Sequence, residues 1–417
     1  MTEKRVVITG MGTVTCIGKN INEFKDSLFA GRCGISLLEG MDKYGEMAVK
    51  VGGQVKDFNP VELGMDAGSV RRSDRFSQFG ICAAMQAMEQ SGLKASENVE
   101  PGRLGVYVGS GIGGMQTFID QTIVMKEEGA RRVSPLFIPM MIGNLGAGNI
   151  AIKFNACGPC LPVVSACATS THAVGEAFRA IKFGMADAII AGGTEAAVNP
   201  LAIGGFANMK ALSTAENPLE ACLPFDARRG GFVMAEGAGI LILEEYEHAV
   251  KRGAHIIAEV SGYGNTCDAY HYTAPRPDGT TTAAALSQSL SEAGYTNDAL
   301  LYINAHGTGT HMNDACETKA IKIALGEEQA RKVMISSTKS MHGHMLGATG
   351  AVELIASAIA LEEGVLPPTI GYKEPDPECD LDYIPNTARR VQAEYALSCS
   401  LGFGGHNAAV TLRRYNG

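Results

Sequence analysis

The chain has 417 residues, of which 46% are hydrophobic and 19% charged, so it can bury a large core and is long enough for two or three domains. Its formal net charge of −9 argues against a general binder of nucleic acids or membrane surfaces. No apolar run approaches the ~18 to 20 residues that span a bilayer, and no secretory leader is visible, so we expect a cytoplasmic protein. In that compartment the 11 Cys are expected to be reduced thiols.

The first half of the chain alternates strand and helix patterns. Apolar runs that end in glycine predict strands at 6–12, 104–108 and 188–191. Apolar spacing predicts helices around 22–31 and 74–92. Because alternating strands and helices build α/β layers, we expect a mostly parallel sheet with helices on its faces.

One strand-to-helix turn in this half carries a cysteine. Val163 and Val164 are interpreted as the end of a buried strand, and apolar spacing from Ala173 to Ile181 predicts a helix that begins just after Cys167. Free N–H groups and the helix dipole stabilise an anion there, which favours a thiolate nucleophile. The alternative is a small buried cysteine with a packing role only.

The second half repeats the order of the first. The segments that match the first-half strands and the strand before Cys167 are 258–264, 302–309, 333–337 and 396–405. We therefore predict two similar α/β halves, residues 1–254 and 255–417, related by a pseudo-twofold axis that brings equivalent loops to one cleft.

Glycine-bracketed loops in the second half follow predicted strands, where α/β folds place ligand sites. These loops carry His306, Lys339 and Phe403, and Glu353 lies on the helix after Lys339. Taken singly, His306 is compatible with a hydrogen-bonded structural residue, and Lys339 with Glu353 is compatible with a surface ion pair. Because all of them follow strand ends, a role in an active site is favoured over these alternatives.

Two cysteine and histidine pairs suggest other chemistry with weaker support. Cys157 and Cys160 have the spacing of a thioredoxin-like redox pair, but no matching fold pattern surrounds them. No second pair at similar spacing completes a zinc site. His342 and His344 could ligate a metal, but no third ligand stands at a usual offset.

The loop after the strand at 104–108 matches a dinucleotide fingerprint in form. Its glycines are Gly109, Gly111 and Gly114. The acidic residue that such a site needs about 20 residues further on, at the end of a second strand, is not evident. The match is therefore weak evidence for a dinucleotide-binding site.

Together these motifs resemble the β-ketoacyl-acyl carrier protein synthases. The resemblance rests on Ser-Ala-Cys-Ala-Thr-Ser around Cys167, Asn-Ala-His-Gly-Thr-Gly-Thr around His306, Ser-Thr-Lys-Ser-Met-His-Gly-His around Lys339, and Gly-Phe-Gly-Gly-His-Asn around Phe403. It spans essentially the whole chain, in order. It implies the thiolase fold, two similar α/β halves in a five-layered α-β-α-β-α arrangement, and is strongest with the type II synthase of fatty-acid synthesis, although Ala168 is closer to type I.

The resemblance implies a decarboxylating condensation between an acyl group and malonyl-acyl carrier protein. Cys167 would carry the acyl group as a thioester, and the backbone N–H groups of Cys167 and Phe403 would form an oxyanion hole. His306 and His344 would stabilise the enolate formed when malonyl loses CO2. Lys339 would add positive charge beside the two histidines, with Glu353 as its partner, and Phe403 would move as a gate.

The resemblance also implies residues that bind the substrate and its carrier. Ile112 would line the far wall of the acyl pocket. The positions that would bind the phosphopantetheine arm are Thr273, Thr308 and Thr310. The positions that would dock the acidic carrier protein are Arg71, Arg72, Arg131, Arg132 and Lys210. A homodimer is implied, and no metal or organic cofactor.

Two positions depart from the family's pattern. Gly230 replaces an acidic or polar residue, and His342 stands where a small or uncharged residue is usual. Two related functions stay open: the ketosynthase of a dissociated polyketide pathway, and a non-catalytic partner that sets chain length. Since the non-catalytic partner lacks the nucleophile, Cys167 argues against that alternative.

Overall fold

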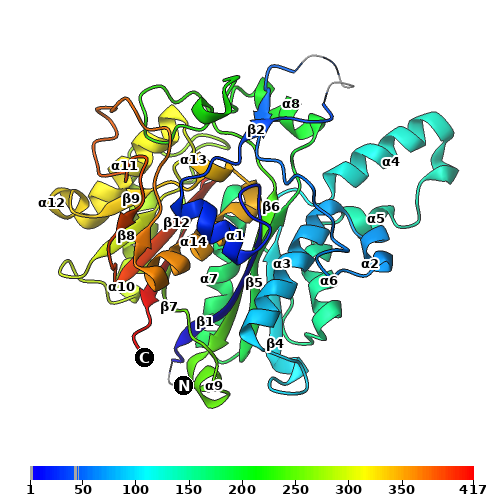
Figure 1. Ribbon diagram of the computed structural model, residues 1–417, viewed down its shortest axis with the longest axis horizontal. Coiled ribbons are helices and arrows are strands. Elements are labelled where there is room, and N and C mark those ends of the chain that lie inside the picture. The colour runs from blue at the N-terminus through cyan, green and yellow to red at the C-terminus, as the bar shows by residue number, and fades with distance from the viewer. Residues whose placement is uncertain (1–2, 42–44, 46) are drawn as a thin grey trace.

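A computed structural model describes residues 3–41, 45 and 47–417. Its main feature is one nine-stranded sheet in the order β4-β5-β6-β1-β7-β13-β12-β8-β9 (Figure 1). The strands of this sheet are β1 Val6–Val14, β4 Leu104–Gly109, β5 Ala188–Glu195, β6 Gly237–Glu245, β7 Ala258–Cys267, β8 Leu301–Asn304, β9 Met334–Ser336, β12 Tyr395–Gly402 and β13 His406–Arg414. Two small two-stranded sheets consist of β2 Ser36–Leu37 with β3 Val51–Gly52, and β10 Val365–Leu366 with β11 Arg389–Arg390.

Helices cover both faces of the sheet. They are α1 Ile21–Phe29, α2 Ala67–Arg71, α3 Arg75–Ser91, α4 Met115–Glu128, α5 Phe137–Met141, α6 Leu145–Phe154, α7 Thr169–Lys182, α8 Pro200–Asn208, α9 Tyr246–Lys251, α10 Thr280–Glu292, α11 His311–Leu325, α12 Glu327–Ala330, α13 Lys339–His342 and α14 Thr349–Glu363. The predicted helix at 74–92 is confirmed as α3: Asp74 caps its first turn, and Gly92 ends it with φ of 66°.

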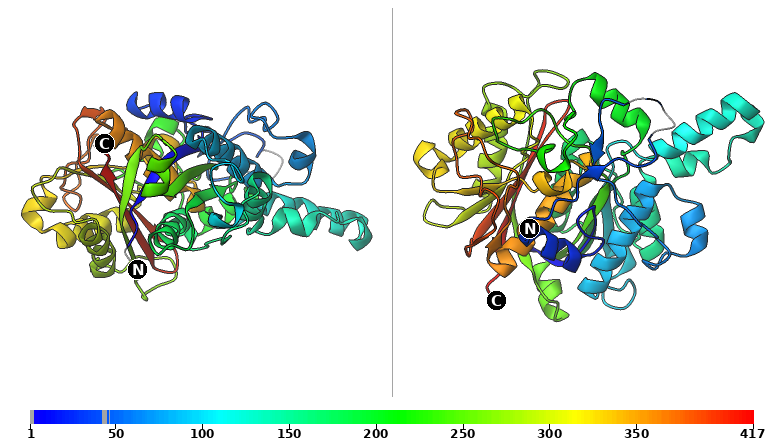
Figure 2. Two further views of the ribbon diagram at one scale, coloured as in Figure 1. Left: turned by 90° about the horizontal axis from the view of Figure 1, so that it is seen from below. Right: turned by 45° about the horizontal axis from the view of Figure 1, so that its top comes forward.

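The predicted five-layered α-β-α-β-α arrangement is confirmed. Helices α3 and α6 pack on the β4-β5-β6-β1 end of the sheet, and α10 packs on β7 and β13 at the other end. Helices α7 and α14 contact strands of both ends, and Figures 1 and 2 show them in the middle of the molecule. The largest apolar core forms around this central layer, which includes Val174 and Ile355. Burial of this layer fixes the ends of α7 and α14 relative to both sets of strands.

The prediction of a mostly parallel sheet is wrong. The pairs β4–β5, β8–β12 and β8–β9 are parallel, but β1–β6, β5–β6, β7–β13 and β12–β13 are antiparallel. The reason is local for β12 and β13: only residues 403–405 separate them, and such a short connection allows an antiparallel hairpin alone. Gly404 and Gly405 adopt φ of 90° and 80° there.

The two ends of the sheet have matching strand orders. Strands β4-β5-β6-β1 on one side of the centre correspond to β8-β12-β13-β7 on the other, and they meet where Val6–Ile8 pair with Ala258–Val260. The predicted boundary at 254/255 lies between α9 and β7. The β1–β7 pairing and the helices α7 and α14, which contact strands of both halves, join the two halves into one body. The division into two domains therefore stays a prediction.

Candidate active site

Cys167 lies at a sharp turn before a central helix. Ala166 has φ of 51°, an unusual value for a residue with a side chain, and a short helical turn, Ala166–Ala168, leads into α7. The end of β12 packs against this turn, since a Cβ at Gly402 would lie 2.5 Å from the Ser165 carbonyl oxygen. Only glycine allows this approach, and it brings Phe403 next to Cys167.

The segment before Cys167 is not the buried strand that the sequence predicts. Residues 161–164 form no ladder, the one bridge nearby joins Cys160 to Val106, and the Val164 side chain is 63% exposed. An apolar run alone does not distinguish a core strand from a segment at the outer edge of a sheet.

A cavity of about 220 Å³ opens above Cys167. It brings together eight of the predicted residues: Cys167, His306, His344, Phe403, Thr273, Thr308, Thr310 and Lys210. These residues come from six separate segments, so the cavity is made by the tertiary fold. Four segments follow β7, β8, β9 and β12, as expected for a ligand site at strand ends, one precedes α7, and Lys210 follows α8.

The Cys167 thiol is protonated at neutral pH. Burial raises its pKa to about 12, although the Lys339 charge and the backbone N–H groups of Phe403 and Cys167 lower the pKa. The expectation of a resting thiolate is therefore wrong, because desolvation outweighs the effect of the helix terminus. The same two N–H groups lie close enough to the sulfur to lower its pKa.

His306 and His344 form a buried pair. Their ring centroids are 5.3 Å apart and their planes are nearly perpendicular. Burial and the nearby Lys339 charge lower the pKa of both rings well below the ordinary value, so both imidazoles are neutral. His344 Nδ1 lies 3.0 Å from the Thr349 hydroxyl oxygen; when that hydroxyl donates, Nε2 carries the proton and is free to donate to a ligand.

Lys339 and Glu353 form a hydrogen-bonded ion pair with no solvent exposure of either side chain. Lys339 begins α13, and Glu353 projects from α14. Burial raises the pKa of Glu353, and the Lys339 ammonium opposes that rise. The alternative of a surface ion pair is therefore excluded, and the charge of Lys339 reaches both histidines and Cys167.

Replacing Glu353 with Ala is expected to lower the free energy of unfolding by about 3–5 kcal/mol, because it leaves the Lys339 charge buried without a partner. Denaturant unfolding monitored by circular dichroism measures the change. The matched control is Glu328→Ala, which breaks the exposed pair with Lys332 and is expected to cost at most about 1 kcal/mol. Equal effects of the two substitutions would contradict a tightly coupled pair.

The His342 departure has a local structural role. Its ring is buried, with Nδ1 2.7 Å from the Gly343 carbonyl and Nε2 3.1 Å from the Thr338 hydroxyl oxygen. Burial lowers its pKa to about 3, so it adds no charge beside His344. Since both ring nitrogens are engaged, the metal hypothesis for His342 and His344 loses its support.

The other departure is at an open position. Gly230 is exposed, and a Cβ there would meet no atom within 4 Å. Its lack of a side chain therefore changes no contact in the cavity.

Glu195 is a buried carboxylate near the site that the sequence motifs do not single out. Glu195, at the end of β5, accepts hydrogen bonds from the backbone N–H groups of Gly111 at 2.8 Å, Ile112 at 3.2 Å and Gly347 at 3.0 Å. Because the N–H groups of Gly111 and Ile112 already donate to Glu195, they are not available to bind a nucleotide phosphate. The signal available in the sequence is the Glu that stands two residues after Gly193.

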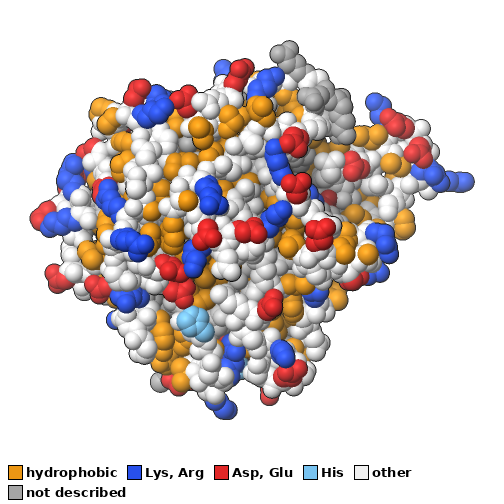
Figure 3. Space-filling model, viewed as in Figure 1, with side chains coloured by type: hydrophobic (Ala, Val, Ile, Leu, Met, Phe, Trp, Pro, Cys, Tyr) orange, Lys and Arg blue, Asp and Glu red, His pale blue; other side chains and the backbone are white. Residues whose placement is uncertain are grey.

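The remaining predicted residues lie outside the cavity. Ile112 packs against the apolar cluster that contains Cys167, Ile203 and Leu346. The basic residues lie in exposed segments: Arg71 at the end of α2, Arg72 next to it, and Arg131 and Arg132 in the turn after α4. Arg132 forms an exposed ion pair with Glu128. Figure 3 shows Lys or Arg side chains at the far end of the α4 arm.

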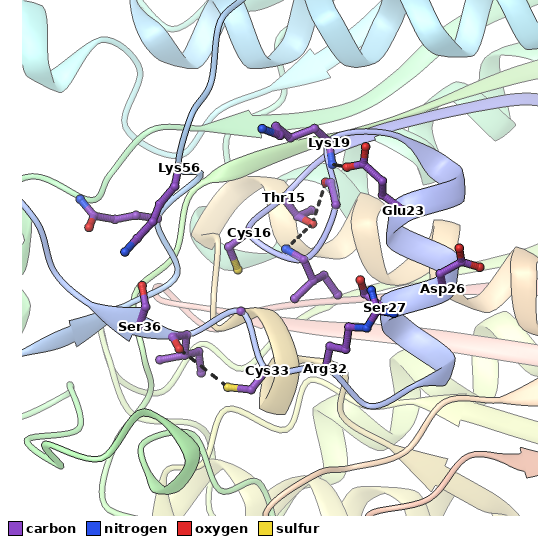
Figure 4. A pocket seen from close by; sticks show the side chains of 15 residues that line it. Thr15, Cys16, Lys19, Glu23, Asp26, Ser27, Arg32, Cys33, Ser36 and Lys56 are labelled. Atoms are coloured by element: carbon purple, nitrogen blue, oxygen red, sulfur yellow. Dashed lines mark hydrogen bonds between the residues drawn. The ribbon is translucent and has the colours of Figure 1, made fainter.

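A larger cavity, of about 460 Å³, lies behind the site and contains none of the predicted residues (Figure 4). Its floor touches α13: the Cys16 thiol donates to the His342 carbonyl at 3.5 Å, and the Gly34 N–H donates to the Met341 carbonyl at 2.8 Å. These contacts stabilise the position of α13, the helix that carries Lys339.

The redox alternative finds no structural support in the two cysteines that suggested it. Cys157 and Cys160 are exposed free thiols outside the cavity, and the Cys157 thiol bonds to Asn155. Among residues 3–41, 45 and 47–417, no helix combines the length and the apolarity needed to cross a membrane.

Comparisons with known proteins point to one family. Residues 3–249 match the family described as "Beta-ketoacyl synthase, N-terminal domain" and residues 257–373 match "Beta-ketoacyl synthase, C-terminal domain". The chain is 46% identical to proteins named "3-oxoacyl-[acyl-carrier-protein] synthase 2" from Synechocystis sp. over 414 residues and from Staphylococcus aureus over 412 residues, covering 99% of this chain and of each relative.

Solved structures agree with these relatives. A ketosynthase solved with its type II polyketide acyl-carrier protein and a hexaketide has a TM-score of 0.92 and 35% identity, covering 99% of this chain and all of the other. A beta-ketoacyl synthase from Burkholderia phymatum STM815 has a TM-score of 0.91 and 34% identity, with the same coverage.

Proposed function

This chain belongs to the beta-ketoacyl synthase family, and we propose that it is a type II 3-oxoacyl-[acyl-carrier-protein] synthase, which lengthens a fatty acyl chain by two carbons. It is a condensing acyltransferase by family. The observation that carries the proposal is the cavity in which Cys167 meets two buried, neutral histidines.

The first half-reaction loads the enzyme. The Cys167 sulfur bonds to the thioester carbonyl carbon of an acyl-carrier protein, the bond to the carrier's sulfur breaks, and the carrier's thiol leaves with the Cys167 proton. The N–H groups of Cys167 and Phe403 stabilise the negative oxygen of the intermediate. Because Cys167 is protonated at rest, the proton moves as the carbonyl is attacked.

The second half-reaction makes the carbon–carbon bond. N–H groups of His306 and His344 bind the thioester oxygen of malonyl-carrier protein, so the electrons released as CO2 leaves are held as an enolate. The enolate carbon bonds to the acyl carbonyl on Cys167, and the Cys167 sulfur leaves and is reprotonated. The buried Lys339 charge supports the negative oxygen. None of these steps calls for a metal or an organic cofactor.

Carrier binding would use the cavity mouth and the basic residues outside it. Thr273, Thr308 and Thr310 line the cavity and offer hydroxyl groups to the phosphopantetheine arm. The exposed arginines after α2 and α4 are the proposed dock for an acidic carrier. The structural neighbour solved with its acyl-carrier protein supports such a partner.

The double charge reversal Arg131→Glu/Arg132→Glu is expected to raise the KM for carrier-bound substrates about tenfold or more, because it replaces attraction by repulsion during encounter. The kcat and the rate with a free acyl-pantetheine thioester should stay near the wild-type values. The control is Lys332→Glu, two residues after α12, which lies at the opposite end of the molecule from α4 (Figure 1). An unchanged KM for the carrier-bound substrate would show that Arg131 and Arg132 do not take part in carrier binding.

Ile112→Phe is expected to shift the substrate preference toward short acyl groups. Ile112 packs against the cluster that holds Cys167, so a larger ring there fills space that a long acyl chain needs. The loss for long chains should be about tenfold or more, while acetyl transfer to Cys167 continues. Competition between short and long acyl-carriers, followed by the mass of the enzyme, gives the ratio directly.

A homodimer would cover the apolar edge beside β4. Val164 and Leu161 are exposed there, next to α6, where Ile152 is 79% exposed. Large exposed apolar side chains gathered at the edge of a sheet are typical of a surface that another chain covers. Light scattering on the purified protein should therefore give twice the mass of one chain, and Val164→Asp should weaken the assembly.

The deciding experiment mixes the purified chain with acyl-carrier and malonyl-carrier proteins and measures all protein masses. A 3-ketoacyl group on the carrier, two carbons longer than the acyl donor, is expected. Absence of an acylated enzyme with any donor would overturn the proposal. The second candidate, a polyketide ketosynthase, is favoured by the likeness to the hexaketide-bound ketosynthase, and it predicts repeated additions without reduction.

A further inference from the structure

Glu317 is a buried carboxylate that holds the backbone at His306. Its side chain has no solvent exposure, and it projects from α11. Oε1 accepts the His306 N–H at 2.6 Å, and Oε2 accepts the Gly307 N–H at 2.8 Å. Both oxygens therefore accept hydrogen bonds at once, which an ionised carboxylate does more strongly than a protonated one.

In the part of the chain that the structure describes, the hydrogen-bond partners of this carboxylate are two backbone N–H groups and one thiol. Among the described residues, no Lys, Arg or His forms an ion pair with Glu317. Burial raises its pKa, as does the charge of Asp314 on the same helix, and the hydrogen-bond donors oppose the rise. The third donor is the thiol of Cys399 on β12, whose sulfur lies 2.9 Å from Oε1.

Cys399 is suited to donate and not to react. Its side chain is 2% exposed, it does not line the cavity above Cys167, and the distance to Oε1 is short for a sulfur donor. Burial and the Glu317 charge raise the pKa of Cys399 well above its ordinary value, so the proton stays on sulfur. A hydrogen bond to a charged acceptor is stronger than one between neutral groups.

The loop at His306 and Gly307 has little freedom to adjust to a shift of the Glu317 carboxylate. Gly307 has φ of 36°, and its carbonyl accepts a hydrogen bond from the Ser337 hydroxyl at 2.7 Å. A shift of the Glu317 carboxylate would therefore move the His306 backbone, and the ring that faces His344 would move with it.

We propose that Cys399 is a positioning residue for decarboxylation: its thiol, as the third donor to Glu317, keeps the carboxylate in the position that fixes His306 opposite His344. This inference rests on the proposed function, because it assigns His306 to the decarboxylating half-reaction. Cys399 acts through Glu317 and touches no reacting atom.

Cys399→Ala is expected to slow conversion of malonyl-carrier to acetyl-carrier by about tenfold near neutral pH, the size expected for loss of one hydrogen bond to a charged group. With one donor fewer, the Glu317 pKa rises, so the acidic limb of the rate profile should move to higher pH. Acylation of Cys167 by acyl-carrier should stay within about twofold of wild type, because that step uses the N–H groups of Cys167 and Phe403. Cys399→Ser restores a donor and should recover most of the rate.

The control is Cys82→Ala, which removes a buried thiol from a separate apolar cluster around α3. Should Cys399→Ala fail to fold, Cys399→Val fills the space without a donor and makes the same test. An unchanged decarboxylation profile in the Ala or Val variant, or an equal fall in both half-reactions, would overturn the inference and leave Cys399 a packing residue. Absence of decarboxylation in the wild type would count against the proposed function instead.

Discussion

Replacing Cys167 with Ala is expected to abolish condensation and to leave decarboxylation of malonyl-carrier protein in place. Among the described residues that line the cavity, Cys167 is the only thiol, whereas the two histidines that would hold the enolate do not depend on the sulfur. The predicted loss exceeds about 10³-fold in product formation, as for removal of a covalent nucleophile. Intact-protein mass spectrometry after mixing with acyl-carrier measures the acyl adduct, and the mass of the carrier measures the product.

Two controls sharpen this result. Cys167→Ser keeps a hydroxyl nucleophile of much lower reactivity and should form the adduct only slowly. The double variant Cys157→Ala/Cys160→Ala removes the two exposed thiols of the redox alternative and should behave as wild type. An acyl adduct that persists in Cys167→Ala, or a loss of activity in the Cys157/Cys160 variant, would move the nucleophile elsewhere.

His306→Ala and His344→Ala are each expected to slow decarboxylation by about 10²–10³-fold, the usual cost of removing one donor to a developing negative oxygen. Acylation of Cys167 should continue in both variants. Conversion of malonyl-carrier to acetyl-carrier, followed by mass in the absence of an acyl donor, isolates the affected step. His255→Ala is the control, because that imidazole is 70% exposed and does not line the cavity.

The pH dependence of decarboxylation tests the protonation state of the pair. Since the pKa of both rings lies well below the ordinary 6.5, protonation does not begin as the pH falls through 6.5, and the neutral donors persist in weak acid. The decarboxylation rate should therefore show no loss centred near pH 6.5 that belongs to these histidines. A loss centred there, absent in the two Ala variants, would show that the rings titrate like exposed imidazoles.

Much of the fold was predictable from local patterns. The caps of α3 at Asp74 and Gly92, the glycine-ended strands and the recurrence of the same order in the second half all follow from short stretches of sequence. The antiparallel pairs were not predictable from alternation alone, because pairing direction depends on which strands become neighbours. Gly404 and Gly405 mark the turn that makes β12 and β13 antiparallel, but the same glycines also fit an active-site loop, so the sequence alone does not identify the hairpin.

The sequence by itself determined which residue types stand after which strands, and so which loops were candidates: those of Cys167, His306, Lys339 and Phe403. Only the tertiary structure decided their protonation. The Cys167 thiol and both histidines are neutral because segments distant in the chain remove water from them, and no local pattern records that burial. The same holds for the hydrogen bonds of Glu195 and of Glu317 with Cys399, which join residues up to 152 positions apart. Desolvation and hydrogen bonding depend on neighbours in space, and those neighbours exist only after the chain has folded.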